Sequence, residues 1–171
     1  MMFRDEADIL GKCLEHWYDL GVRDFYLIDN RSGDTSYILA DCFAQEHAAD
    51  TRVFLDMECA TDWPGRRVIN ELKNRALADG CDWIFPADAD EFLVVSGWLI
   101  EPPMTDSAPG SWGEIKYLNI LPDGREEWQE PQRKCFGLLT PETTISMGNH
   151  LIEEHPPTLE TSAYYRHHSL R

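Results

Sequence analysis

The first half of the chain alternates short apolar runs with longer segments of helical periodicity. In residues 5–20, 36–45 and 67–78, apolar side chains recur three or four positions apart, which predicts three helices. The side chains expected inside are Ile9, Leu10, Cys13, Leu14, Trp17 and Leu20 in the first helix, Ile38, Leu39, Cys42 and Phe43 in the second, and Val68, Ile69, Leu72 and Ala76 in the third. We expect acidic residues in the first turn of the first helix, and Gly21 and Gly80 to end the first and third helices. Residues 22–28, 52–55 and 81–86 are short apolar runs between or after these helices, and another apolar run follows at 92–95. Crossovers of this length join parallel strands with a right-handed turn. The alternation therefore predicts an α/β domain with a mainly parallel central sheet.

The second half has a different character. Residues 101–110 read as a polar, proline-containing loop, and residues 112–121 alternate as a strand does. Residues 132–139 are a further strand candidate, and few helix signals remain after position 100. Because no linker-like stretch divides the sequence, we predict one domain over residues 1–171, with a strand- and loop-rich C-terminal part.

Composition excludes several classes of function. The 171 residues are 43% hydrophobic, which is typical of a globular domain, and carry a formal net charge of -16. So acidic a chain repels nucleic acid, and we expect no nucleic-acid partner. The longest nearly apolar run, residues 92–100, is too short to cross a bilayer, so no transmembrane segment is expected.

The cysteines bear on the cellular compartment. There are five, an odd number, and no two of them form a C-x-x-C pair. This pattern favours free, buried thiols in a reducing compartment over a disulfide framework or a zinc ribbon. No signal peptide opens the sequence, and we expect a cytoplasmic protein.

Two carboxylates after the run at 81–86 are the first candidates for chemistry. In an extended segment Asp88 and Asp90 point the same way, with small Ala89 between them. Hard divalent cations such as Mg²⁺ or Mn²⁺ prefer such oxygen ligands and leave room for phosphate oxygens. Ligands of open parallel sheets bind beyond the carboxyl ends of the strands, where this segment is expected to lie. The alternative reading is a solvated acidic turn.

A second polar segment, residues 29–35, also follows a predicted strand. It reads Asp-Asn-Arg-Ser-Gly-Asp-Thr and starts at Asp29 and Asn30. One reading is a polar turn that caps the next helix through Asp34 or Thr35. The other is a site whose carboxylate or amide hydrogen-bonds a base edge or a ribose hydroxyl. Residues 4–6, which follow a possible first strand, are expected to lie near this segment in such a sheet.

Taken in order, three motifs resemble the glycosyltransferase family 2-like group with the GT-A fold. They are Arg4-Asp5-Glu6-Ala7-Asp8 before a helix, the segment that begins Asp29-Asn30, and Trp83 followed by Asp88-Ala89-Asp90-Glu91-Phe92. The matching motifs fall between residues 4 and 95, over half of the chain. The resemblance implies a Rossmann-like three-layer sandwich, with residues 1–100 as the nucleotide-sugar half and 101–171 as the acceptor half.

The resemblance also implies roles for individual residues. Arg4, Asp5 and Glu6 match the motif that lines the nucleotide pocket. Asp29 and Asn30 match the second-strand motif, whose acidic residue contacts the base. Asp88 and Asp90 match the metal and diphosphate motif, in its D-A-D-E form. These assignments imply Mn²⁺ or Mg²⁺ as cofactor and a UDP- or GDP-sugar as donor.

The C-terminal half supplies further candidates. His150 follows a possible strand in a Gly-Asn-His element, and we consider it as a third metal ligand or a phosphate contact. Glu127 is our candidate for the base that takes the acceptor proton, because Trp128 beside it suits a sugar face. Phosphate charge would be neutralised by basic residues, for which the candidates are Arg66, Arg67, Arg133, Lys134 and Arg166.

The predicted function is transfer of a sugar from a nucleotide-diphosphate donor to a hydroxyl of a glycan, lipid or protein. Asp90 is assigned a catalytic role beside its metal role, because a cation there stabilises the leaving diphosphate. Two alternatives stay open. One is a binding module that holds a nucleotide-sugar without turnover. The other is a metal-dependent phosphohydrolase built from Asp88, Asp90 and the histidines.

Overall fold

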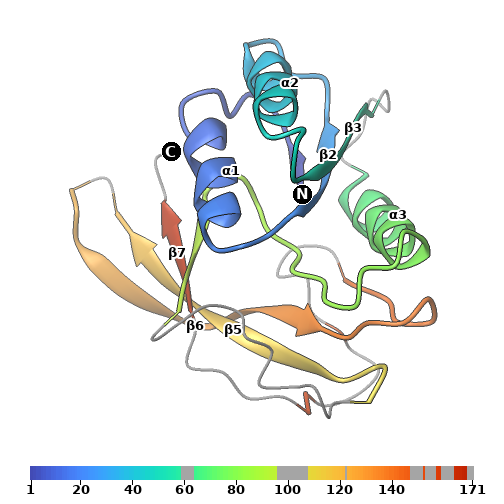
Figure 1. The fold of residues 1–171 in the computed structure, drawn as a ribbon. Coiled ribbons are helices and arrows are strands. Elements are labelled where there is room, and N and C mark those ends of the chain that lie inside the picture. The colour runs from blue at the N-terminus through green and yellow to red at the C-terminus, as the bar shows by residue number, and fades with distance from the viewer. Residues whose placement is uncertain are drawn as a thin grey trace.

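The structure is a computed structural model that describes residues 1–58, 64–95, 108–121, 123–146, 152, 157–158 and 164–168. Three short strands form an all-parallel sheet in the order β1-β2-β3: β1 (Met2–Phe3), β2 (Asp24–Asp29) and β3 (Arg52–Met57). Helix α1 (Leu10–Asp19) links β1 to β2, and α2 (Ser36–Glu46) links β2 to β3. These two helices pack together on one side of the sheet, and α3 (Gly65–Ala78) lies on the other (Figure 1).

A second sheet of four strands lies below the first in the view of Figure 1. Its order is β4-β7-β5-β6, with β4 (Glu91–Val94), β5 (Trp112–Ile120), β6 (Glu126–Gly137) and β7 (Tyr164–His168). The β4–β7 and β5–β6 pairs are antiparallel, and β5 and β7 run parallel. The α/β class is therefore confirmed, but the predicted single, mainly parallel sheet is replaced by a parallel sheet and a mixed one.

Helix α1 buries the side chains that the periodicity predicted: Leu10, Cys13, Leu14 and Trp17. It begins at Leu10, five residues later than predicted. Residues 5–7 do not join the helix because side chains from the loop after β2 and from the first residue of α2 accept their backbone N–H groups. The predicted acidic first turn is therefore a loop that precedes the helix.

Helix α2 shows where the sequence pattern failed. Ile38, Leu39, Cys42 and Phe43 were expected inside, but the buried residues are Ser36, Ala40 and Phe43. Ile38 is 60% exposed, and Cys42 is an exposed thiol. The prediction is thus confirmed for Phe43 and wrong for Ile38 and Cys42, because the buried stripe follows the spacing i, i+4, i+7 through two small residues.

Helix α3 buries Val68, Ile69, Leu72 and Ala76 as predicted, together with Lys73. The predicted helix stops are also confirmed. Gly21 follows α1 with φ 94° and Gly80 follows α3 with φ 88°, a conformation that costs glycine little.

The predicted strand at 81–86 is wrong in this structure. Its ladder pairing is a single antiparallel bridge from Ile84 to Gly137 at the end of β6. Its aromatic residues are half-buried and stack on the second sheet, since the rings of Trp83 and Phe85 lie 6.3 and 5.6 Å from that of Phe136. Pro86 has no N–H to contribute to a ladder. The segment therefore reaches Asp88 as an irregular, half-buried connection packed against β6.

Candidate metal and nucleotide site

The Asp88–Glu91 segment is a tight turn that leads into β4. The Glu91 N–H donates to the Asp88 carbonyl oxygen (3.2 Å), and the Asp88 N–H donates to Glu91 Oε2 (2.8 Å). Burial alternates along the segment, because Ala87 and Ala89 are buried while Asp88 and Asp90 are half-buried. Glu91 uses its own side chain to close the turn that presents the two aspartates.

Lys134 of β6 lies beneath this turn. Its Nζ donates to Asp88 Oδ2 (2.6 Å) and to Glu91 Oε2 (2.7 Å). The side chains of Lys134 and Glu91 are 1% and 2% exposed, whereas that of Asp88 is 48% exposed. The ammonium is therefore shielded from solvent, and the carboxylate of Asp88 sits between it and the surface.

The charges at this turn are mutually dependent. Burial opposes the charge on Lys134, yet the adjacent carboxylates of Asp88 and Glu91 raise its pKa above the ordinary value. Burial raises the pKa of Glu91, an effect that Lys134 counteracts. The pKa of the neighbouring phenol, Tyr117, is raised by burial and then by the charge of Glu91. A lysine that stays ionised here balances one of the carboxylates.

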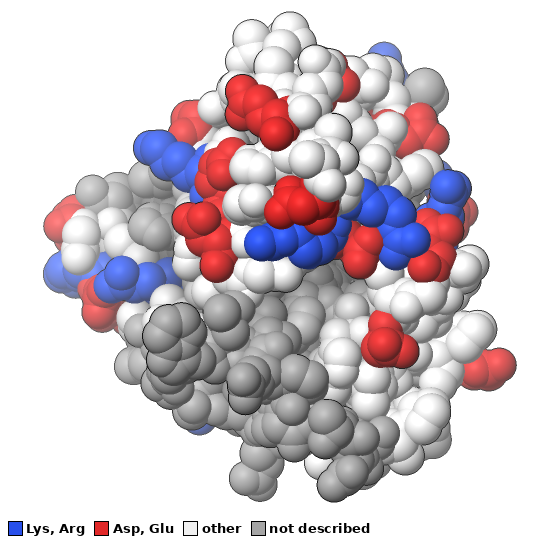
Figure 2. All heavy atoms as spheres, viewed as in Figure 1, with Lys and Arg blue, Asp and Glu red and all other residues white. Residues whose placement is uncertain are grey.

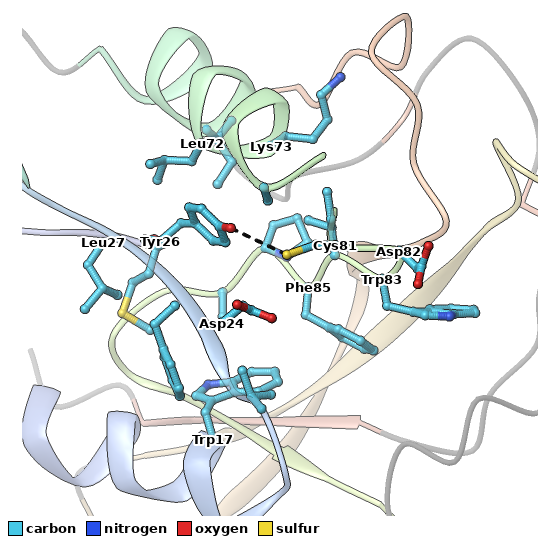
Figure 3. A pocket seen from close by; sticks show the side chains of 18 of the residues that line it. Trp17, Asp24, Tyr26, Leu27, Leu72, Lys73, Cys81, Asp82, Trp83 and Phe85 are labelled. Carbon is cyan, nitrogen blue, oxygen red and sulfur yellow. Dashed lines mark hydrogen bonds between the residues drawn. The ribbon is translucent and has the colours of Figure 1, made fainter. Parts of the chain in front are cut away.

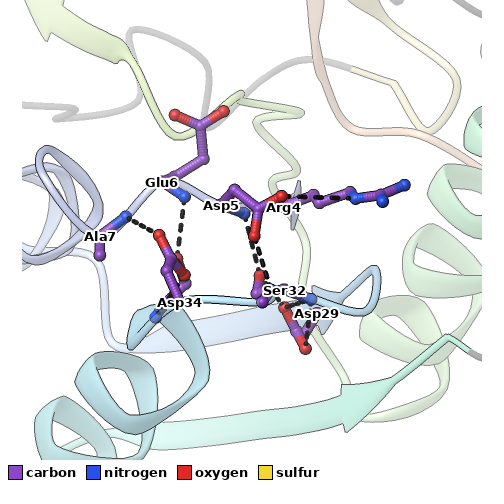
Figure 4. Close-up of polar contacts among 9 residues, drawn as sticks. Arg4, Asp5, Glu6, Ala7, Asp29, Ser32 and Asp34 are labelled. Carbon is purple, nitrogen blue, oxygen red and sulfur yellow. Dashed lines mark hydrogen bonds and ion pairs between the residues drawn. The ribbon is translucent and has the colours of Figure 1, made fainter.

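A second polar region lies at the carboxyl ends of β1 and β2, where two loops interlock (Figure 4). The N–H groups of Asp5, Glu6 and Ala7 donate to Ser32 Oγ (3.0 Å), Ser36 Oγ (2.8 Å) and Asp34 Oδ2 (3.1 Å). In return, the Gly33 N–H donates to Asp5 Oδ1 (2.6 Å). The structure thus brings the Arg4–Glu6 motif against the 29–35 loop, at the sheet edge where the sequence placed both.

Asp29, the residue predicted to contact the base, and its neighbour Asn30 are both buried. Asp29 is 1% exposed, and both its carboxylate oxygens accept the Ser32 N–H at 3.2 Å. Asn30 is 2% exposed, and its N–H donates to the Phe3 carbonyl oxygen (2.8 Å). Arg4 lies at the surface and forms an ion pair with Asp5 (3.6 Å). In this state Asp29 orders its own loop.

Helix α1 connects the two polar regions. It follows the Arg4–Glu6 loop directly, and its Cys13 Sγ donates to the carbonyl oxygens of Asp88 (3.8 Å) and Glu91 (3.5 Å). The turn therefore packs on the first element that leaves the nucleotide-side loops.

The C-terminal candidates are placed differently. Glu127 is exposed in β6 and lies 3.7 Å from Arg125. Its partner in β5 is Asn119, whereas the partner of Lys134 is Ile115. The two positions are thus four residues apart along β5, about 13 Å. The ion-pair partner of Glu127 in this structure is thus Arg125, and His150 lies outside the described residues.

Two hollows flank the parallel sheet. One, of about 320 Å³, lies at the carboxyl end of β3, with Ile28, Asp56, Glu58 and Arg75 among its lining. The Glu58 N–H donates to the Asp29 carbonyl oxygen (2.8 Å), so this hollow adjoins the 29–35 loop. The other, of about 570 Å³, is largely apolar and is enclosed by side chains of β2, α3 and residues 80–87 (Figure 3). Neither lining includes Asp88 or Asp90.

A further set of potential ligands lies where α1 meets α2. Oxygen or nitrogen atoms of Glu15, Glu46 and His47 come within 4.8 Å of one another. His47 Nε2 is 3.1 Å from Glu15 Oε1, which makes this an ion pair between the helices when the imidazole is protonated. The contact accounts for the cluster without a metal.

Sequence reasoning missed the role of Lys134, which it treated as a candidate for phosphate neutralisation. At 1% exposure the ammonium is enclosed by the turn and is shielded from a phosphate in solvent. A signal was present, because Lys134 stands next to Cys135 and Phe136 in a predicted strand. A lysine inside an apolar strand needs an internal carboxylate partner.

Comparison with known proteins gives no family. No protein-family model matches the chain, and no curated protein matches its sequence. Among the described helices, none combines the length and the apolar character needed to cross a membrane. On the face in Figure 2, basic side chains lie next to acidic ones. Among the ion pairs of the described residues, Arg67 pairs with Glu58 and Glu71.

Proposed function

We propose that this chain is a GT-A-like glycosyltransferase domain of the family 2-like group. The reaction is transfer of a sugar from a UDP- or GDP-sugar to a hydroxyl of a glycan, lipid or protein. The observation that carries the proposal is the Asp88–Glu91 turn, which holds two half-exposed aspartates over a buried Lys134–Glu91 pair. A solvated acidic turn needs no such internal support.

The donor set of the turn fits a hard divalent cation, Mn²⁺ or Mg²⁺. Asp88 and Asp90 offer carboxylate oxygens at the surface, although Asp88 Oδ2 is shared with Lys134. These two residues would hold the cation, and His150 stays a predicted third ligand. A cation bound there supplies positive charge against the leaving diphosphate.

The chain's own residues divide the remaining work. The interlocked loops at the carboxyl ends of β1 and β2 stand where open parallel sheets bind ligands, and the hollow beside Glu58 adjoins them. We assign the nucleotide to this region. Glu127 remains the predicted base, to be reached through an acceptor bound along the second sheet.

A binding module without turnover is the second candidate. Two observations favour it: Asp29 is engaged by Ser32, and Glu127 lies four β5 residues from the lysine that supports the turn. This candidate predicts metal-dependent nucleotide binding with no sugar transfer.

The test begins with Mn²⁺-dependent binding of UDP and GDP by calorimetry, followed by donor hydrolysis and transfer assays. Asp88→Ala and Asp90→Ala are expected to abolish the metal-dependent binding. Asp123→Ala, a change at an exposed carboxylate near Glu127, is the matched control and should bind as wild type does. Binding that survives both aspartate substitutions would refute the proposed site, and binding without transfer would select the module.

A further inference from the structure

A buried lysine beneath the aspartates has a definable role at the site. Lys134 cannot contact a ligand in solvent, because its side chain is 1% exposed. It contacts the carboxylates at both ends of the turn, Asp88 and Glu91, and leaves Asp90 between them. We propose that Lys134 is a positioning residue, which holds Asp88 in the one orientation that binds the divalent cation. This inference rests on the proposed function.

The geometry of the contact supports positioning. A 2.6 Å contact from a buried ammonium fixes one oxygen of Asp88, while the Asp88 N–H is fixed by Glu91 Oε2. Glu91 therefore fixes the backbone of Asp88, and Lys134 fixes its side chain. Glu91 Oε2 also accepts from Lys134 Nζ, so one buried carboxylate oxygen joins the turn to β6. Partners of this kind orient the groups that ligate metals and typically contribute 10- to 100-fold to affinity.

The charge count shows what else the lysine does. Asp88, Asp90 and Glu91 contribute three carboxylates to the turn, and the buried ammonium of Lys134 contacts two of them, those of Asp88 and Glu91. If Lys134 served only to balance the charge of Glu91, removing the charges of Lys134 and Glu91 together would leave cation binding unchanged. If Lys134 positions Asp88, the same change would weaken cation binding. One variant therefore separates the two roles.

The deciding variant is Lys134→Met combined with Glu91→Gln. It keeps the net charge of the turn and removes the ammonium from Asp88. Lys73→Met is the matched control, because Lys73 is also a buried lysine at 2% exposure but bonds to backbone carbonyls of Thr140, Pro141 and Thr143. The readout is the Kd for Mn²⁺ alone, measured by electron paramagnetic resonance of the free ion.

We expect the double variant to bind Mn²⁺ about 10- to 100-fold more weakly than wild type and Lys73→Met to bind within about twofold. A double variant that binds Mn²⁺ as tightly as wild type would overturn the positioning role, as would an equal loss in Lys73→Met. If Lys134→Met alone does not fold, the charge-balanced double variant still decides between the two roles.

A metal-free measurement separates this inference from the proposed function. Three-bond NMR couplings report whether the Asp88 side chain occupies one χ1 rotamer or averages over several. We expect one rotamer in wild type and Lys73→Met, and averaging in the double variant. Wild-type protein that binds neither Mn²⁺ nor a nucleotide would refute the function and leave these couplings to decide the positioning. A single rotamer in the double variant would overturn it.

Discussion

Two buried lysines join the N-terminal half of the chain to its C-terminal half, and they do so with opposite chemistry. Lys73, from α3, is 2% exposed and donates to the carbonyl oxygens of Thr140 (2.8 Å), Pro141 (3.0 Å) and Thr143. Lys134, from β6, is 1% exposed and contacts two carboxylates. The carbonyl bonds of Lys73 attach α3 to the 140–143 segment, away from the Asp88–Glu91 turn. The carboxylate contacts of Lys134 place its charge at the Asp88–Glu91 turn, so this lysine also contributes to the electrostatics of the candidate site.

The largest expected effect is loss of the carboxylate-bound lysine. Lys134→Met leaves Glu91 buried without its cation, and breaking a buried ion pair from one side costs about 3–5 kcal/mol. Urea unfolding at pH 7, followed by tryptophan fluorescence, gives the free energy of unfolding. Adding Glu91→Gln should recover a large part of the loss, since the fully buried carboxylate is then replaced by a neutral amide. A single variant as stable as wild type would show that the pair is not coupled to the fold.

The carbonyl-bound lysine should matter less for stability and not at all for the cation. Lys73→Met leaves three carbonyl groups of the 140–143 segment without their donor, a loss of about 2 kcal/mol. The same urea experiment measures this loss, and Mn²⁺ titration is expected to be unchanged. If Lys73→Met weakens Mn²⁺ binding as much as Lys134→Met does, the carbonyl contacts of Lys73 and the carboxylate contacts of Lys134 do not differ in their effect on the site.

Local sequence patterns predicted much of the fold, but they did not predict the contacts of the two buried lysines. Periodicity found three helices and the inward faces of α1 and α3, because a strong apolar stripe is a local property. It failed at α2, where small Ser36 and Ala40 are buried and Ile38 is exposed. It also failed at residues 81–86, where the aromatic side chains stack on Phe136 and the backbone forms no strand. Both errors depend on partners far away in the sequence.

The candidate site shows the same division. Local spacing picked out Asp88 and Asp90, and the motif order placed Arg4–Glu6 near the 29–35 loop. The sequence did not reveal that Lys134 supports the turn, because the two are 46 residues apart. Nor did it reveal that Asp29 is engaged by Ser32 three residues later, since the same residues fit both a loop and a ligand contact.

A smaller effect on the free energy of unfolding should appear at alkaline pH, from the residue next to Lys134. Burial raises the pKa of Cys135, the neighbour of Lys134, from 9.0 to about 12. A raised folded-state pKa contributes stability that is complete below pH 9 and is lost as pH rises to about 12. The unfolded chain ionises first, so this thiol lowers the free energy of unfolding by about 1.4 kcal/mol per pH unit in that window.

The measurement is urea unfolding from pH 8 to 11 under reducing conditions, for wild type and Cys135→Ala. Other buried groups, such as Cys13, also titrate late, so the difference between the two slopes isolates Cys135. The variant should lose stability less steeply with pH. Identical slopes would mean that the Cys135 thiol is open to solvent and that the region around Lys134 is less tightly packed than described.

The smallest effect is expected at a cation that also pairs with two carboxylates but lies at the surface. Arg67 is 51% exposed and contacts Glu71 (2.9 Å) and Glu58. Water and salt screen these pairs, so Arg67→Ala should leave the melting temperature unchanged within error at about 0.15 M salt. A modest decrease at low salt would fit the same picture. A large decrease in melting temperature at both salt concentrations would show that the number of carboxylate partners, rather than burial, decides how much such an ion pair stabilises the fold. Lys134 would then have no special standing among these cations.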